Sequence, residues 1–244
     1  MGRPARSRLG ARNRTVAFGF RIGTRNIFRN GSGWVCRFTS SHETTRLRFA
    51  PPDADRPPLH PVLNAKYSFH LRSQDKRRDL PDKIILGQDA TGTVAQVMLK
   101  LLAYLLFHRE RLKIGTNLHL DSVPFVPDVA QLDFQLRPVL WVECGECSVG
   151  KLHKLAVKVP EAELWVVKRS VADAESLSLA MAKMELRRDR YNLIGFDEEM
   201  FDELCGLLQS RNELLWVSGG FDPPNLQFDF NGLWFDAPFT VLRY

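Results

Sequence analysis

One segment constrains the fold more than any other: Val139–Cys144, which is apolar on both faces apart from Glu143. A strand of this kind is typical of the centre of a sheet that is covered by helices on each side. The next two segments fit this picture. Residues from about Ser148 to Lys158 have the spacing of an amphipathic helix, and Glu163–Val167 reads as a second buried strand. The sequence therefore predicts an α/β fold.

The remaining elements follow from the spacing of apolar side chains. A helical stripe runs from Val94 to Leu106, with Thr91 or Thr93 available as the N-cap. Two more amphipathic helices are predicted at Ala172–Arg188 and Asp197–Ser210. Strands are predicted at Lys66–Leu71, Lys83–Leu86, Val129–Phe134, Tyr191–Gly195, Leu214–Val217, Leu226–Phe230 and Leu233–Phe235.

The last three strands differ in character from the rest, because they follow one another without helices. Asn231-Gly232 is the strongest two-residue signal for a hairpin between two of them. We therefore expect one mixed sheet with helices on both faces and an antiparallel C-terminal appendage.

The first 61 residues have a different composition. They contain 12 Arg, no Lys and three acidic residues, which gives this segment a formal charge of +9. Because the whole chain has a formal charge of +6, residues 62–244 carry −3. We expect 1–61 to be a basic, disordered extension and 62–244 to be a single domain. The extension has three readings: an organellar transit peptide, a basic arm for nucleic acid, or translation from a start assigned too far upstream, with Val62 as a candidate start.

Composition narrows the class of protein. Hydrophobic residues make up 44% of the chain, enough for a sizeable core, and the longest apolar run, Val97–Phe107, is broken by Lys100 and is too short for a membrane span. Four unevenly spaced cysteines favour a reducing compartment over secretion. We expect a cytoplasmic protein that does not associate with membranes. Because the folded part is mildly acidic, the overall pI does not indicate a nucleic-acid partner.

Two acidic residues are predicted to meet at the ends of neighbouring strands. If Val129–Phe134 and Val139–Cys144 form a hairpin with a four-residue loop, Asp133 faces Pro138 and Asp128 faces Glu143. Two carboxylates at that separation repel each other unless a cation lies between them, and oxygen ligands suit Mg²⁺ or Mn²⁺. The backbone carbonyl of Cys144 would supply a further oxygen.

Lysines lie on the helix that follows this hairpin. Lys151, Lys154 and Lys158 fall on one stripe. A lysine beside a carboxylate-bound divalent ion stabilises phosphate charge, as metal-assisted phosphodiester hydrolysis requires. The competing interpretation is that the stripe is a solvated helix face and that the two acids lie on the surface.

These motifs resemble a known family. Thr93–Tyr104, Pro127-Asp128 and Leu140–Gly145, followed by the lysine-bearing helix, are similar to the YaeQ-like family of bacterial proteins, in the PD-(D/E)XK nuclease-like superfamily. The similarity extends over about Leu63–Tyr244. It implies a restriction-endonuclease-like core in which Asp128 and Glu143 are the metal-binding acids.

The chain departs from the superfamily pattern at two places. The usual lysine two residues after the second acid is replaced by Gly145, and the family supplies a lysine from the next helix, which matches Lys154 by alignment and Lys151 by reach. The family usually has Glu-Thr at the start of the first helix, where this chain has Gly92-Thr93. Asp89 or Gln96 would replace that acid only in part.

Three further patterns are set aside. Gly145–Lys151 resembles a P-loop but is followed by Leu152 where a magnesium-binding Ser or Thr is needed, so no nucleotide cofactor is expected. Cys144 and Cys147 have no second cysteine pair for zinc, and a redox role stays open. The C-terminal aromatics are expected to be core residues. They are Trp216, Phe228, Phe230, Trp234 and Phe235.

The sequence thus supports two functions. One is cleavage of nucleic-acid phosphodiesters with Mg²⁺ or Mn²⁺, in which Asp128, Glu143, Lys151 and Lys154 are the catalytic candidates. The other is a non-catalytic binding or regulatory role on the same scaffold, with a nucleic acid or a protein as partner.

Overall fold

The computed structural model describes residues 27–30, 33–36, 65–88, 92–118 and 123–244. The chain divides into two compact units, Met1–Arg56 and Pro57–Tyr244. In the first, β1 (Ile27–Asn30) and β2 (Gly33–Cys36) form an antiparallel hairpin. No periodicity in the sequence indicates this hairpin. The other residues of the 1–61 extension lie outside the described part of the chain.

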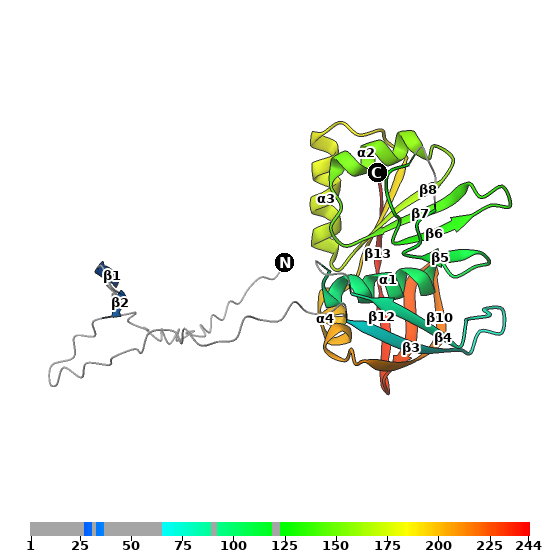
Figure 1. Ribbon diagram of the computed structural model, residues 1–244, viewed down its shortest axis with the longest axis horizontal. Helices are drawn as coiled ribbons and strands as arrows, with labels where there is room; N and C mark the ends of the chain where they lie inside the picture. The colour runs from blue at the N-terminus through cyan, green and yellow to red at the C-terminus, as the bar shows by residue number, and fades with distance from the viewer. Residues whose placement is uncertain (1–26, 31–32, 37–64, 89–91, 119–122) are drawn as a thin grey trace, which may run out of the picture. The chain divides into compact units, whose positions relative to one another are not determined.

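The second unit contains two mixed sheets (Figure 1). A five-stranded sheet has the order β12-β11-β10-β3-β4, in which β3 and β10 are parallel. A six-stranded sheet has the order β13-β9-β8-β7-β6-β5, in which β7, β8 and β9 are parallel. The strands of the first sheet are β3 (Lys66–Ser73), β4 (Lys83–Gly87), β10 (Arg211–Phe221), β11 (Pro224–Phe230) and β12 (Leu233–Pro238). Those of the second are β5 (Leu112–Ile114), β6 (Val129–Leu132), β7 (Pro138–Cys144), β8 (Glu163–Lys168), β9 (Tyr191–Gly195) and β13 (Thr240–Arg243).

Four helices lie within the described residues. They are α1 (Val94–Leu106), α2 (Val149–Lys158), α3 (Val171–Lys183) and α4 (Glu198–Gly206). Each begins after a side chain that accepts a hydrogen bond from the first turn of the helix: Thr93, Ser148, Ser170 and Asp197. The N-cap of α1 is thus the second of the two predicted candidates.

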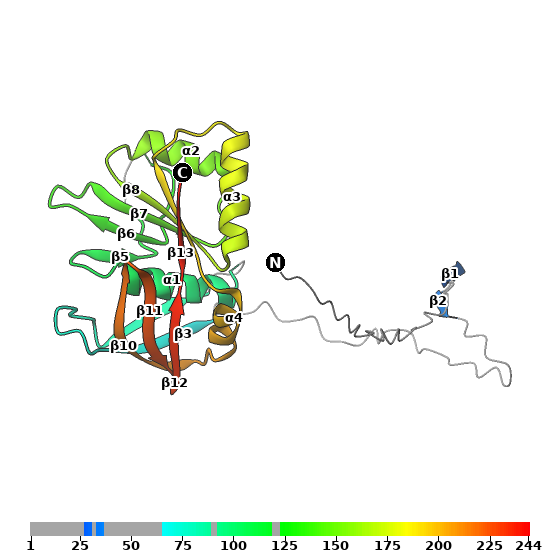
Figure 2. The same cartoon turned by 180° about the vertical axis from the view of Figure 1, so that it is seen from behind.

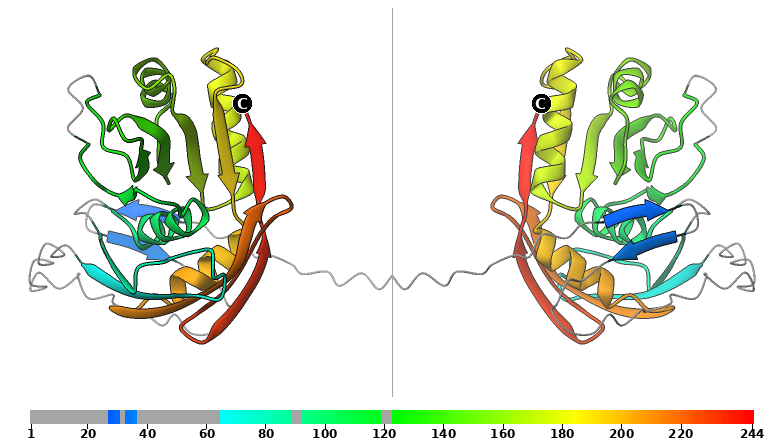
Figure 3. Two further views of the ribbon diagram at one scale, coloured as in Figure 1. Left: turned by 90° about the vertical axis from the view of Figure 1, so that its right-hand side faces the viewer. Right: turned by 90° about the vertical axis from the view of Figure 1, so that its left-hand side faces the viewer.

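The helices and sheets form alternating layers. Residues of α2 and α3 pack with Trp141, Leu164 and Leu193 on one face of the six-stranded sheet. Residues of α1 and α4 pack with the opposite face of that sheet and with the five-stranded sheet. Figures 1 and 2 show α1 lying between the two sheets, and Figure 3 shows the five-stranded sheet curving beneath α1 and α4.

The predicted α/β class and the antiparallel pairing of the C-terminal strands are confirmed, but the prediction of a single sheet is wrong. The C-terminal strands β10, β11 and β12 join β3 and β4 in a sheet of their own, through parallel pairing of β10 with β3. Two short edge strands, β5 and β13, were not predicted. Pairing between segments about 140 residues apart leaves no mark on local periodicity, so the sequence pattern reveals the strands but not which sheet they enter.

The predicted helix at Ala172–Arg188 is too long. Helix α3 ends at Lys183, where Glu185 adopts a positive φ of 51° and the Leu186 N–H turns back to the Met181 carbonyl. This is a C-terminal capping turn, and it places the buried Leu186 against the core. Helix α4 is likewise shorter than predicted, ending at Gly206.

The hairpin between β6 and β7 differs from the prediction at its turn. Leu132, not Asp133, pairs with Pro138, and the register shifts by one residue before Gln131 pairs with Leu140. Leu136 adopts a positive φ of 63°, and the Asp133 carboxylate accepts hydrogen bonds from the backbone of Gln135 and Arg137. The loop is thus shorter than the predicted four-residue loop and is followed by a bulge, an arrangement that is common in β-hairpins. The bulge restores the predicted register deeper in the hairpin, where Val129 pairs with Val142.

Within the described residues, no helix combines the length and apolar character needed to span a membrane.

Candidate functional site

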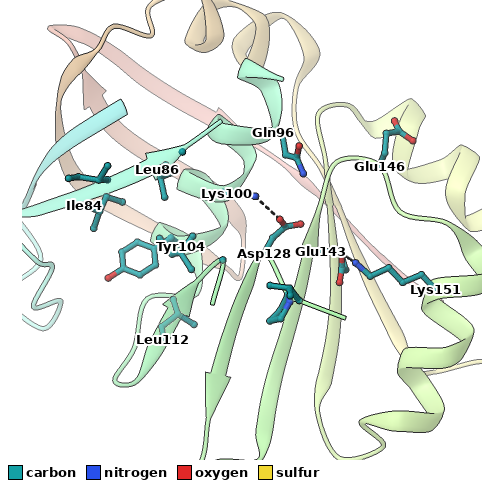
Figure 4. Close-up of a pocket in the computed structure, with 16 residues that line it drawn as sticks. Ile84, Leu86, Gln96, Lys100, Tyr104, Leu112, Asp128, Glu143, Glu146 and Lys151 are labelled. Atoms are coloured by element: carbon teal, nitrogen blue, oxygen red, sulfur yellow. Dashed lines mark hydrogen bonds and ion pairs between the residues drawn. The ribbon is translucent and has the colours of Figure 1, made fainter. Parts of the chain in front are cut away.

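A cavity of about 800 Å³ lies among β4, α1, β5, the entry to β6 and the end of β7. Among its lining residues are the predicted acids Asp128 and Glu143 and the candidate catalytic lysine Lys151 (Figure 4). Lys100, Gln96 and Tyr104 reach it from α1. The structure therefore brings residues from both layers of the core into one space.

Asp128 precedes β6 and leaves the strand ladder at this point. Its N–H donates to the Val142 carbonyl at 3.1 Å, so pairing ends one residue before the predicted Asp128–Glu143 pair. The carboxylate is held by two donors. Oδ2 accepts from the Cys144 N–H at 2.7 Å, and Oδ1 lies 3.0 Å from Lys100 Nζ on α1.

Glu143 extends from β7 on the same face as Trp141, two residues before it. Oε1 accepts a hydrogen bond from the Trp141 indole at 2.7 Å, and Oε2 accepts one from Lys151 Nζ at 2.5 Å. The side chain of Glu143 is only 4% exposed, whereas that of Lys151 is 26% exposed. Lys151 also lies over the Phe125 ring, 5.6 Å from its centroid. Lys151 is placed to do this because the Ser148 cap begins α2 just beyond β7.

The environment of Glu143 perturbs its ionisation. Burial raises the pKa of Glu143, and the hydrogen bond and charge of Lys151 oppose that rise. The nearby Asp128 carboxylate adds to the rise, because a like charge disfavours ionisation of Glu143. Lys100 and Lys151, each paired with one of the acids, supply positive charge that offsets this repulsion.

The donors on Asp128 and Glu143 occupy each carboxylate oxygen once. Each oxygen has a second lone pair, and two carboxylates together with water and a substrate phosphate are the usual ligands of Mg²⁺. The pair therefore suits a hard divalent cation that takes ligand positions now held by lysine. Within the described part of the chain, no group of three or more His, Cys, Asp and Glu side chains is arranged as a metal site.

Comparison with known proteins decides the family. A sequence profile described as YaeQ protein matches residues 65–217. The chain belongs to the YaeQ family. The predicted family membership is confirmed, and the matched span contains Asp128, Glu143 and both candidate lysines.

Two solved YaeQ structures share this fold. The YaeQ protein from Xanthomonas axonopodis pv. citri is 20% identical, with a TM-score of 0.54, and the match covers 74% of this chain and 99% of that one. The YaeQ protein from Pseudomonas syringae is 15% identical, with a TM-score of 0.58, and the match covers 74% of this chain and 97% of the other. No curated protein matches the sequence.

The two candidate lysines lie in different places. Lys151 lines the cavity and contacts Glu143, whereas Lys154 is exposed and is not among the lining residues. Of the suggested substitutes for the missing helix acid at Gly92, Gln96 lines the cavity and Asp89 lies outside the described residues.

Sequence reasoning missed Lys100, Tyr104 and Trp141. A signal for the first two exists: Gln96, Lys100 and Tyr104 are spaced four residues apart on a helix that is otherwise almost wholly apolar, which places them on one face. A charged residue there must find a partner, because an unpaired buried charge is costly. No comparable signal identifies Trp141, whose indole contact depends on the rotamer it adopts in the core.

The surroundings of Cys144 and Cys147 disfavour the thiolate form of both side chains. Cys144 is buried, and burial raises its pKa well above the usual range. Burial also raises the pKa of Cys147 to about 12, although it lies just before α2. A thiol with so high a pKa is a poor nucleophile at neutral pH, which argues against the redox interpretation. The prediction that the C-terminal aromatics are core residues holds for Trp216, Phe228, Phe230 and Phe235, whereas Trp234 is exposed.

Proposed function

We propose that this protein is a divalent-metal-dependent nuclease with a restriction-endonuclease-like core, as in the PD-(D/E)XK nuclease-like superfamily. The observation that carries the proposal is the convergence of Asp128, Glu143 and Lys151 in one cavity. The two acids come from neighbouring strands and the lysine from the first turn of the next helix. Their order in the chain, their spacing and their contacts are those expected of two metal-binding acids and a lysine that stabilises charge on the phosphate.

The displaced lysine has a structural explanation. Gly145, at the position of the usual lysine, adopts a φ of +76°, in the left-handed region that disfavours residues with a Cβ. An added Cβ would meet only Leu99 at 3.6 Å, which is ordinary contact, so backbone conformation rather than space favours glycine. The chain turns sharply here into α2, and that turn carries Lys151 back to Glu143.

Asp128 and Glu143 would hold Mg²⁺ or Mn²⁺, with the Cys144 carbonyl as a further candidate ligand. When bound, the ion would polarise the phosphate and favour ionisation of an attacking water. The Trp141 indole and the Cys144 N–H keep the two carboxylates oriented. Lys151 and Lys100, released from the carboxylates, would turn their ammonium groups to the phosphate oxygens and stabilise the negative charge that develops there.

The test is cleavage by the full-length protein. We expect end-labelled DNA or RNA to be cut with Mn²⁺ and to stay intact with EDTA. Asp128→Asn, Glu143→Gln and Lys151→Ala should each lower the rate about 10²-fold or more, because each removes a ligand or a charge that acts on the transition state. Lys154→Ala is the matched control, since this lysine lies on the same helix outside the cavity.

Two results would contradict the proposal. One is the absence of cleavage of single- and double-stranded DNA and RNA. The other is cleavage that survives in Asp128→Asn and Glu143→Gln, which would assign the activity to a contaminant.

A second candidate function is a non-catalytic binding protein on the same scaffold. The observation that favours it is the pairing of both acids with lysines, combined with Gly92 in place of the family's helix acid. In that case Mn²⁺ would leave the thermal stability of the protein unchanged.

A further inference from the structure

The cavity has two chemically different ends. Figure 4 shows Ile84, Leu86, Tyr104 and Leu112 gathered at one end, and Gln96, Lys100, Asp128, Glu143, Glu146 and Lys151 at the other. The proposed phosphodiester chemistry uses the charged end alone. The apolar end is left without a role, although it opens into the same space.

Two exposed apolar residues are also part of the lining. Ile85 on β4 and Val126, next to the Pro127-Asp128 pair, line the cavity and are 60% and 50% exposed. Exposed apolar side chains that gather at one concave site, rather than lying singly on the surface, are typical of a surface that a ligand covers. Such a ligand must carry an apolar, planar or compact group a short distance from an anionic group.

The two carboxylates lie too deep in the cavity for the phosphates of an intact duplex to reach them. The side chains of Glu143 and Asp128 are 4% and 15% exposed, so a phosphate must enter the cavity to approach them. The bases of a duplex are stacked and paired, and enzymes that act inside a pocket take nucleotides out of that arrangement or use single strands. A cavity of about 800 Å³ is large enough for one nucleotide and falls within the usual size of ligand pockets.

We propose that the apolar end holds the base of one unpaired nucleotide while its phosphate lies at the charged end, so that the substrate is single-stranded DNA or RNA. This inference rests on the proposed nuclease function and specifies its substrate class. The base would pack on Leu112 and Ile84 and against the Tyr104 ring, contacts that are tolerant of sequence because every base has an apolar face. Gln96, on α1 at the charged end, offers the one neutral polar side chain among those labelled there.

The test measures binding separately from cleavage. Fluorescence anisotropy of the full-length protein compares an oligothymidylate strand, a duplex of equal length and an abasic strand with the same number of phosphates. The buffer contains Ca²⁺ and about 0.3 M salt, which weakens binding through phosphates alone, including binding by the arginine-rich extension. We expect the oligothymidylate to bind about tenfold more tightly than either of the other two, since burial of a base contributes to it alone.

Two exposed valines supply a matched pair of variants. Val126→Asn, at the cavity, should weaken binding of the oligothymidylate about threefold or more through lost apolar contact. Val157→Asn, at a valine that is 66% exposed on α2 and is not among the lining residues, should leave binding unchanged. Neither substitution touches the core, so both variants should fold.

The outcomes separate this inference from the proposed function. The inference is overturned if the duplex or the abasic strand binds as tightly as the oligothymidylate. It is also overturned if Val126→Asn binds the oligothymidylate as tightly as the wild type does. Both conclusions hold even if Mn²⁺-dependent cleavage occurs. Free thymidine monophosphate that displaces the labelled strand as effectively as unlabelled oligothymidylate does would also overturn the inference, because the cavity would then be a site for a mononucleotide. Preferential binding of the single strand without cleavage supports the inference and contradicts the nuclease.

Discussion

The two acid–lysine pairs of the cavity differ in how they are built. Glu143 and Lys151 belong to segments eight residues apart, and the carboxylate is almost fully buried beside the Trp141 indole. Asp128 and Lys100 are much further apart in the chain, and their side chains are 15% and 12% exposed. Burial dominates the ionisation of Glu143, whose pKa is raised despite its lysine.

We infer from this difference that the two ion pairs have different roles. The Glu143–Lys151 pair is part of the packing at the end of β7, so its lysine is required for stability as well as for charge. The Asp128–Lys100 pair lies where β6 leaves the ladder, and its carboxylate keeps a backbone donor if Lys100 turns away. We therefore expect Lys100 to be the group that a metal ion displaces more easily.

The largest expected effect is on stability. Lys151→Met should lower the free energy of unfolding at neutral pH by about 3 kcal/mol, because it leaves the Glu143 carboxylate buried without its ammonium partner. Urea denaturation measures this loss. Lys154→Met, on the exposed face of the same helix, should change stability by less than about 0.5 kcal/mol. Equal losses in the two variants would show that the Glu143–Lys151 contact has no special weight.

A smaller effect is expected on metal affinity. Lys100→Met should tighten Mn²⁺ binding about tenfold, or about 1.4 kcal/mol, because the ion no longer competes with an ammonium for Asp128. Calorimetric titration of the full-length protein gives the affinity directly. Lys113→Met, at an exposed lysine of β5 that does not line the cavity, is the control. Unchanged or weaker Mn²⁺ binding in Lys100→Met would contradict the proposed competition.

The smallest effect is a change in pH dependence. The pKa of Glu143 is higher in the folded protein than its ordinary value, so the folded state binds this proton more tightly than the unfolded state does. The contribution of Glu143 to stability is therefore complete below the unfolded pKa and is lost as pH rises through the folded pKa. The stability of the wild type minus that of Glu143→Gln should fall over this range.

Glu110→Gln, at an exposed loop residue, is the reference for this measurement. The difference in stability between the wild type and Glu110→Gln should stay nearly constant with pH. A rise of the Glu143→Gln difference with pH would mean that Lys151 outweighs burial.

Much of the fold and of the site was accessible from local patterns. The helix cap at Thr93, the start of a helix near Ser148 and the Asn231-Gly232 turn follow from residue chemistry within a few positions. The register that brings Asp128 toward Glu143 was predicted correctly as far as Val129 and Val142, because a bulge offset the wrong loop length. The ends of α3 and α4 were not predicted, since capping by a positive φ at a residue such as Glu185 depends on what the following chain packs against.

The sequence by itself determined most of the helices and strands, the central strand β7, the candidate acids Asp128 and Glu143, and the family. Those features depend on alternation, helical spacing and short motifs, which are properties of neighbouring residues. Tertiary structure alone decided that the strands divide into two sheets, that α1 lies between them, and that Lys100 and Tyr104 reach the cavity that Asp128 and Glu143 line. Contacts of this kind join residues far apart in the chain, and their geometry is set by packing of the whole core rather than by any local preference.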